Sequence, residues 1–193
     1  MKRITVFCGA RLGSDACYEQ QATALGKALA NQNIGLVYGG ADLGLMGAVS
    51  NGALSENGEV IGVLPKFLQN REIAHKQLTE LILVDSMHER KSKMNDLCDG
   101  IIALPGGIGT LEELFEIMTW VQLGLQNKPI GILNVNSYYA SLIDLIDNMI
   151  GSGFLRAVDK ELLIVSDNIE DLLDRMKNYV SPDIKNQMNN DLT

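Results

Sequence analysis

Residues 103–120, ALPGGIGTLEELFEIMTW, place a cluster of glycines directly before an acidic helix. Glycine lets backbone N–H groups approach a ligand closely, and the dipole of the following helix favours an anion. Gly106, Gly107 and Gly109 could therefore cradle a phosphate, with the carboxylate of Glu113 beside it. The same letters also fit an ordinary tight turn before a capped helix, so both interpretations stay open on this stretch alone.

The capping interpretation rests on residues 110–113, TLEE, which match a capping box with Thr110 as N-cap and Glu113 at position N3. The rest of the helix favours a second role. At 100° per residue, Ile117 and the chain's one tryptophan, Trp120, flank Glu113 opposite the main apolar face. We expect this second apolar face to form a subunit interface, which would shield Glu113 from water and place it for chemistry as well as capping. The main apolar face is predicted to consist of Leu111, Leu114, Phe115, Met118 and Val121.

Residues 87–94, MHERKSKM, bring two cations to the start of another predicted helix. Solvated surface side chains are one interpretation of Arg90 and Lys91, because surface Lys and Arg are the rule. The other is that they meet the same ligand. We expect the strand before this helix to border the strand that leads into Gly106–Thr110, which would bring Arg90 to the phosphate or to the base.

Two further loops are rich in glycine, FCGARLGS at 7–14 and YGGADLGLMG at 38–47. Three such loops in one chain predict a ligand of nucleotide or sugar-phosphate size. No loop matches G-x-x-x-x-G-K-[ST], which disfavours a P-loop NTPase. The first loop lacks G-x-G-x-x-G, and the second strand ends in Tyr38-Gly39 where a dinucleotide enzyme carries an acidic residue, so NAD binding is disfavoured too.

Short apolar runs alternate with helical periods along the chain and must position these loops. The pattern predicts a Rossmann-like, doubly wound α/β fold, a parallel sheet with helices on both faces. We expect one domain over residues 1–180, a loop or short helix within 66–80, and a loose polar tail over 181–193. The predicted strands are 3–8, 34–39, 59–65, 81–84, 100–105, 129–134 and 162–165. The predicted helices are 15–32, 44–57, 87–98, 110–125, 137–151 and 168–180.

The composition excludes several classes of function. The net charge of −8 over 193 residues argues against a broad nucleic-acid or anionic-membrane surface, and no apolar run approaches the ~20 residues that span a bilayer. The start of the chain does not resemble a signal peptide. Cys8, Cys17 and Cys98 have no metal spacing, and neither do His75 and His88, so we expect no metal site, reduced thiols and a cytoplasmic location. A cysteine nucleophile is disfavoured, because small buried thiols are common.

Taken together, the motifs resemble those of the Lonely Guy (LOG) family. PGGIGTLEE at 105–113 matches the family pattern P-G-G-x-G-T-x-x-E, and MHERK at 87–91 matches M-x-x-R-K. FCGARLG, VYGGADLGLMG, PKFLQNRE and IMTWVQLG resemble the family as well, in order, over roughly residues 2–180. The family's C-G-S opening reads Cys8-Gly9-Ala10 here, which removes a possible hydroxyl ligand.

The resemblance implies hydrolysis of the N-glycosidic bond of AMP or an N6-substituted AMP, giving free base and ribose 5-phosphate. Family members of this kind activate cytokinins, and many were once labelled lysine decarboxylases. The resemblance makes Arg90 and Glu113 the catalytic pair. We expect no cofactor, and the second apolar face favours a homodimer. The residues that would bind the nucleotide are Glu72, Lys91, Gly106, Gly107, Gly109, Thr110, Gly39, Gly40 and Met87.

The chemistry of these residues agrees with that activity. Breaking an N-glycoside builds oxocarbenium character on the ribose, which a nearby carboxylate stabilises while it activates a water. The decarboxylase label is disfavoured, because no lysine beyond Lys91 suggests a pyridoxal site and the phosphate site accounts for Lys91. Two alternatives stay open: a general purine nucleoside 5′-monophosphate nucleosidase, and a non-catalytic nucleotide-binding protein on the same scaffold.

Overall fold

The computed structural model describes residues 1–69 and 74–182. Its strands form one parallel sheet in the order β4-β3-β2-β1-β5-β6-β7. Each predicted apolar run overlaps one of these strands, so the predicted sheet is confirmed. The strands are β1 (Arg3–Phe7), β2 (Gly35–Tyr38), β3 (Val60–Pro65), β4 (Glu80–Val84), β5 (Gly100–Ala103), β6 (Ile130–Leu133) and β7 (Leu163–Ser166).

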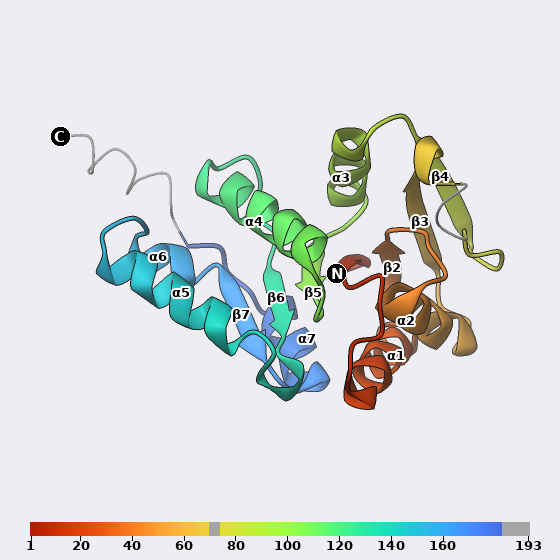
Figure 1. Cartoon of the computed structure of the whole chain (residues 1–193), viewed down its shortest axis with the longest axis horizontal. Helices are drawn as coiled ribbons and strands as arrows, with labels where there is room; N and C mark the ends of the chain where they lie inside the picture. The colour runs from red at the N-terminus through yellow and green to blue at the C-terminus, as the bar shows by residue number, and fades with distance from the viewer. Residues whose placement is uncertain (70–73, 183–193) are drawn as a thin grey trace.

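Helices cover both faces of the sheet, which confirms the predicted doubly wound α/β fold. Figure 1 shows α3 and α4 on one side and α1 and α2 on the other. The buried core divides in the same way, with α5 joining the first pair and α7 the second. The helices are α1 (Ala16–Asn31), α2 (Gly44–Ser55), α3 (Met87–Asp96), α4 (Ile108–Gln122), α5 (Ala140–Gly151), α6 (Ala157–Lys160) and α7 (Ile169–Lys177).

The short elements were the hardest to predict. The four-residue α6 was missed, because it is too short to show a helical period. The predicted loop or short helix within 66–80 contains the 3₁₀ helix η1 (Lys66–Leu68), and a second 3₁₀ helix, η2 (Val135–Ser137), precedes α5. Residues 70–73, and with them Glu72, lie outside the described residues, as do residues 183–193 of the predicted tail.

The central strands are almost wholly buried because helices cover them on both faces. Ile101, Ile102 and Ala103 of β5 have no exposed surface, and neither has Leu36 of β2. Burying an Ile or Leu side chain contributes about 1.5–3 kcal/mol, so this layer fixes the position of every strand end. Within the described residues, no helix is both long enough and apolar enough to cross a membrane.

The three glycine-rich loops meet where the strand order reverses, at the carboxyl ends of β2, β1 and β5. Backbone hydrogen bonds join them. The N–H of Gly9 donates to the carbonyl of Pro105 at 3.0 Å, and the N–H of Leu45 donates to the carbonyl of Gly9 at 3.0 Å. In open α/β sheets this reversal is where ligands bind.

Candidate active site

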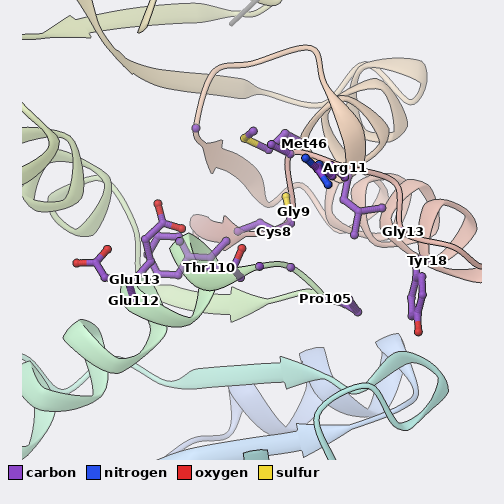
Figure 2. A pocket seen from close by; sticks show the side chains of 18 of the residues that line it. Cys8, Gly9, Arg11, Gly13, Tyr18, Met46, Pro105, Thr110, Glu112 and Glu113 are labelled. Atoms are coloured by element: carbon purple, nitrogen blue, oxygen red, sulfur yellow. The ribbon is translucent and has the colours of Figure 1, made fainter. Parts of the chain in front are cut away.

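A pocket of about 500 Å³ lies at this reversal point. Figure 2 shows Glu112 and Glu113 at one end and Tyr18 at the other, with Gly9 and Thr110 between them. A volume of this size suits a nucleotide-sized ligand. The predicted site residues that line the pocket are Gly39, Met87, Arg90, Gly106, Gly107, Gly109, Thr110 and Glu113. Gly40 and Lys91 are not among its lining residues, although both were predicted to bind the nucleotide.

The predicted capping box is wrong. Helix α4 begins at Ile108 with Gly107 as its N-cap, and no side chain caps it. Thr110 is therefore the third residue of the helix and Glu113 the sixth. The prediction failed because the glycine turn itself enters the helix, two residues earlier than the pattern of polar residues suggests. Glu113 needs another explanation than capping.

The start of α4 has the properties of an anion site. The first N–H groups of a helix have no acceptor within the helix, and here no side chain takes their place. Gly107 and Gly109 do not have positive φ angles, and a Cβ atom on either would meet nothing within 4 Å. The protein's own packing thus does not require glycine at these positions, whereas close approach of a phosphate to the backbone does.

Gly106 is required for a different reason. A Cβ atom there would lie 2.1 Å from Oγ1 of Thr110, so the buried threonine side chain packs directly against the glycine. From the other side, the hydroxyl of Tyr138 donates a hydrogen bond to the carbonyl of Gly106 at 2.5 Å. The turn is therefore held between α4 and the segment before α5.

Arg90 is buried, so the interpretation of this residue as a solvated surface cation is wrong. Its Nε donates to the carbonyl of Val63 in β3 at 3.1 Å, and its Nη1 lies 3.6 Å from Oε1 of Glu113. A Cβ atom on Gly39 would lie 2.0 Å from Nη2 of Arg90. Gly39 therefore leaves the space through which the guanidinium reaches the pocket.

The expected route of Arg90 to the site is also wrong. Strand β4 does not border β5, because β3, β2 and β1 lie between them. Helix α3 instead runs back across the face of the sheet from β4 to β5, and this crossing carries Arg90 over β3. The predicted meeting with the glycine turn of α4 is correct, but the crossover produces it and not strand adjacency.

Glu113 lies on the buried face of α4, 9 % exposed. Burial raises the pKa of Glu113 to about 7, although the charge of Arg90 opposes that rise. Ile117, one turn further along, is 1 % exposed and packs in the same core as Met94 and Leu114. Ile117 is therefore part of the chain's own core, and the argument that it marks a subunit interface is wrong, whereas Trp120 is only partly buried against that core.

Lys91 is buried as well, and its ammonium pairs with two carboxylates. Its Nζ lies 2.6 Å from Oε1 of Glu112 and 2.8 Å from Oε2 of Glu116. Lys91 does not line the pocket, and its contact with the nucleotide stays a prediction. The described lining residues of the pocket include no lysine, so none of them offers an amine for the chemistry of a lysine-bound pyridoxal group.

Sequence reasoning missed several side chains that line the pocket, among them Arg11, Tyr18 and Tyr138. A signal for Arg11 exists, since it lies inside the first glycine-rich loop, FCGARLG. Tyr138 has no such signal. It follows η2, where Asn136 and Ser137 adopt positive φ angles of 49° and 56°, and its ring packs edge-to-face on Tyr18 with centroids 5.9 Å apart.

Cys8 also lines the pocket, and its environment supports our rejection of a cysteine nucleophile. Burial, with the nearby carboxylate of Glu113, raises the pKa of the Cys8 thiol far above its ordinary value. The thiolate is the nucleophilic form of cysteine, so this thiol is inert near neutral pH. Cys8, Cys17 and Cys98 are free cysteines.

The geometry defines the class of protein: a doubly wound α/β protein with an uncapped, glycine-rich helix start beside a buried arginine–carboxylate pair. A family model described as "Possible lysine decarboxylase" matches residues 46–176. The cytokinin riboside 5′-monophosphate phosphoribohydrolase LOG1 of Arabidopsis thaliana is 44 % identical over 93 % of this chain and 84 % of its own. That of Rhodococcoides fascians is 48 % identical over 88 % of this chain and 86 % of its own. This chain belongs to the Lonely Guy (LOG) family.

Solved structures with the same fold include proteins that are named for other functions. A molybdenum cofactor binding protein of Rippkaea orientalis superposes with a TM-score of 0.70 over 92 % of this chain and 97 % of its own, at 21 % identity. The molybdenum cofactor carrier protein of Chlamydomonas reinhardtii gives 0.70 over 91 % and 96 %, at 20 % identity. At such identity these similarities concern the fold alone.

Proposed function

We propose that the protein is a phosphoribohydrolase that cleaves the N-glycosidic bond of an N6-modified adenosine 5′-monophosphate, giving free base and ribose 5-phosphate. The observation that carries this proposal is the buried Glu113 carboxyl, 3.6 Å from Arg90 and beside the uncapped start of α4. The start of α4, midway along the pocket, can hold a phosphate, while Glu113 presents a carboxyl in a dry environment at one end. The names of the curated relatives point to the same activity.

The reaction assigns one task to each part of the pocket. The N–H groups at the start of α4 hold the 5′-phosphate, which fixes the ribose beside Glu113. As the bond from C1′ to the base nitrogen breaks, its electron pair leaves with the base and the ionised carboxylate stabilises the cationic ribose. Glu113 accepts a proton from the attacking water, and that proton is returned to the departing base. Arg90 holds Glu113 in place and orients the nucleotide.

Chromatography of the products formed from AMP, GMP, CMP, adenosine and N6-isopentenyl AMP tests this function. We expect cleavage of N6-isopentenyl AMP to base and ribose 5-phosphate. Equal turnover of AMP and its N6-modified form would favour the general purine nucleotide nucleosidase. Binding without any product would favour the non-catalytic nucleotide-binding protein.

We predict that activity depends on the 5′-phosphate. Adenosine should be turned over at least about 100-fold more slowly than AMP, since it lacks the group that fixes the ribose in place. Gly107→Val should weaken the use of AMP, because its side chain enters the open space where the phosphate approaches the backbone. The measurement is kcat/KM for both compounds.

Gly151→Val is the matched control, because Gly151 also has open space around a Cβ atom but lies at the end of α5. It should leave the preference for AMP over adenosine unchanged. Equal rates for adenosine and AMP in the unmodified protein would contradict the phosphate cradle.

We also propose that the protein is a homodimer. Three large apolar side chains around α4 support this: Ile108 at its start and Leu123 and Leu125 after its end, 88 %, 58 % and 69 % exposed. Exposed apolar groups of this size mark contact surfaces. Light scattering should give a dimer, and Leu123→Asp/Leu125→Asp should shift it toward the monomer. Phe154→Asp, at an apolar side chain that is 87 % exposed and lies outside α4, is the control. A stable monomer of the unmodified protein would refute the proposal.

A cytoplasmic location is part of the proposal too. Its support is the state of the cysteines, all free in the structure. Reduced thiols persist in the cytoplasm, whereas oxidising compartments favour disulfides.

A further inference from the structure

Lys91 pairs with two carboxylates, yet the proposed reaction gives it no task. Its side chain is 10 % exposed and its Nζ lies within 2.8 Å of two carboxylates, Glu112 and Glu116. These two residues flank Glu113 on α4. A buried ammonium held between the neighbours of a buried carboxyl calls for a physical explanation.

The pairing follows from helix geometry. Neighbouring residues on a helix point about 100° apart, so Arg90 and Lys91 on α3 face different parts of α4. Arg90 reaches Glu113, whereas Lys91 reaches Glu112 and Glu116, which are one turn apart on the same side. The two cations therefore divide the carboxylates between them, and Glu113 is left with the weaker contact at 3.6 Å.

This division affects the charge around Glu113. The titratable groups that face the Glu113 carboxyl are Arg90 and Lys91 on α3, Glu112 and Glu116 on α4, and Cys8 after β1. The thiol is neutral, so two positive charges balance two negative ones before Glu113 itself ionises. Without Lys91, two carboxylates would face Glu113 with only Arg90 to oppose them. Like charges disfavour ionisation, so Glu113 would hold its proton to higher pH.

We infer that Lys91 is a positioning residue for the reaction: it binds Glu112 and Glu116, fixes α3 against α4, and keeps Glu113 free to ionise at neutral pH. The inference rests on the proposed function, in which ionised Glu113 activates the water. Contact with the nucleotide, the role that the motif suggested, is not needed for this task.

The test compares Lys91→Met with Lys91→Arg in kcat and KM for AMP across the pH range. With Lys91→Met we expect the acid limb of the kcat profile to move up by about one pH unit, and kcat at neutral pH to fall by about tenfold. KM should change little. Lys91→Arg should return the acid limb toward its original place, because arginine can also bridge the two carboxylates. Lys93→Met, an exposed lysine on the same helix, is the control.

A second variant removes the charges that Lys91 balances. In Lys91→Met/Glu112→Gln/Glu116→Gln the acid limb should return toward that of the unmodified protein, since the neighbours no longer repel the Glu113 charge. If Lys91→Met does not fold, Glu112→Gln/Glu116→Gln alone should move the acid limb to lower pH. A merely structural lysine would give neither shift.

Titration of the Glu113 carboxyl by ¹³C NMR, assigned with Glu113→Gln, gives a readout that needs no turnover. An upward shift in Lys91→Met supports the inference even if the proposed reaction is wrong. A large rise in KM for AMP with an unchanged acid limb and an unchanged Glu113 titration would overturn it, and would return Lys91 to direct nucleotide binding.

Discussion

Glu113→Gln should fold, bind AMP and lose at least about 100-fold in kcat, the scale expected of a general base or an electrostatic stabiliser. Glutamine keeps the size of the side chain and removes the charge that stabilises the cationic ribose. Loss of a helix cap cannot account for the result, because Gly107 is the N-cap of α4 and Glu113 lies in its second turn. The measurements are kcat by product chromatography and AMP affinity by calorimetry.

The proposed role of Glu113 also predicts the direction in which kcat changes with pH. Burial raises the pKa of Glu113 to about 7, and the proposed reaction needs the ionised form. The kcat of the unmodified protein should therefore fall as the pH drops through about 7, and Glu113→Gln should lack that acid limb. Glu161→Gln, an exposed glutamate outside the pocket, is the control. Ordinary turnover in Glu113→Gln would return the carboxyl to a structural role.

The same carboxyl provides a check on folding. The pKa of Glu113 rises from 4.5 to about 7 in the folded state, so folding favours the neutral carboxyl. The contribution of the neutral carboxyl to the free energy of unfolding is therefore lost as the pH rises through 7. Glutamine imitates the neutral form. Glu113→Gln should therefore equal the unmodified protein in free energy of unfolding at low pH and exceed it by about 3 kcal/mol once the carboxyl is ionised.

Arg90→Ala should lose both turnover and nucleotide binding. The change removes a cation from an anion site and leaves Glu113 without its partner at 3.6 Å, so we expect kcat/KM to fall by about 1,000-fold and AMP affinity by about tenfold. Arg175→Ala removes an exposed arginine from α7 and serves as the control.

Combining Arg90→Ala with Glu113→Gln should cost much less than the product of the two single effects, because the residues act as a pair. A double variant whose loss equals that product would show that the two side chains act independently. Unchanged turnover in Arg90→Ala would remove Arg90 from the proposed reaction altogether.

The sheet and the meeting of the glycine loops could be predicted because each depends on local pattern and one general rule. An apolar run such as residues 100–105 reads as a buried strand wherever it lies, and the carboxyl ends of parallel strands share one edge. Gly106, Gly107 and Thr110 were placed correctly for that reason. The start of α4 was misplaced because glycines give little helical signal, although the backbone at 108–109 is already helical.

Side chains whose positions depend on how helices cross the sheet could not be predicted. The carboxylate partners of Lys91 and the route of Arg90 follow from the path of α3 over β3, which no spacing in residues 87–94 encodes. The same holds for Tyr138, which reaches Gly106 only because η2 returns the chain to the pocket. The error about Ile117 has the same origin, since the rotation of α4 against its neighbours decides which face is covered.

The peptide units of Gly9 join all three glycine loops, since its N–H bonds to Pro105 and its carbonyl accepts from Leu45. The loops are therefore preorganised: none of them has to be ordered separately when a ligand arrives. Ordering a loop on binding costs free energy that would otherwise appear as affinity. In a rigid cradle that cost is absent, so the contacts with the phosphate contribute to affinity in full. Lengthening any one of these three loops should loosen the other two. Nucleotide binding should then have a less favourable entropy than in the unmodified protein.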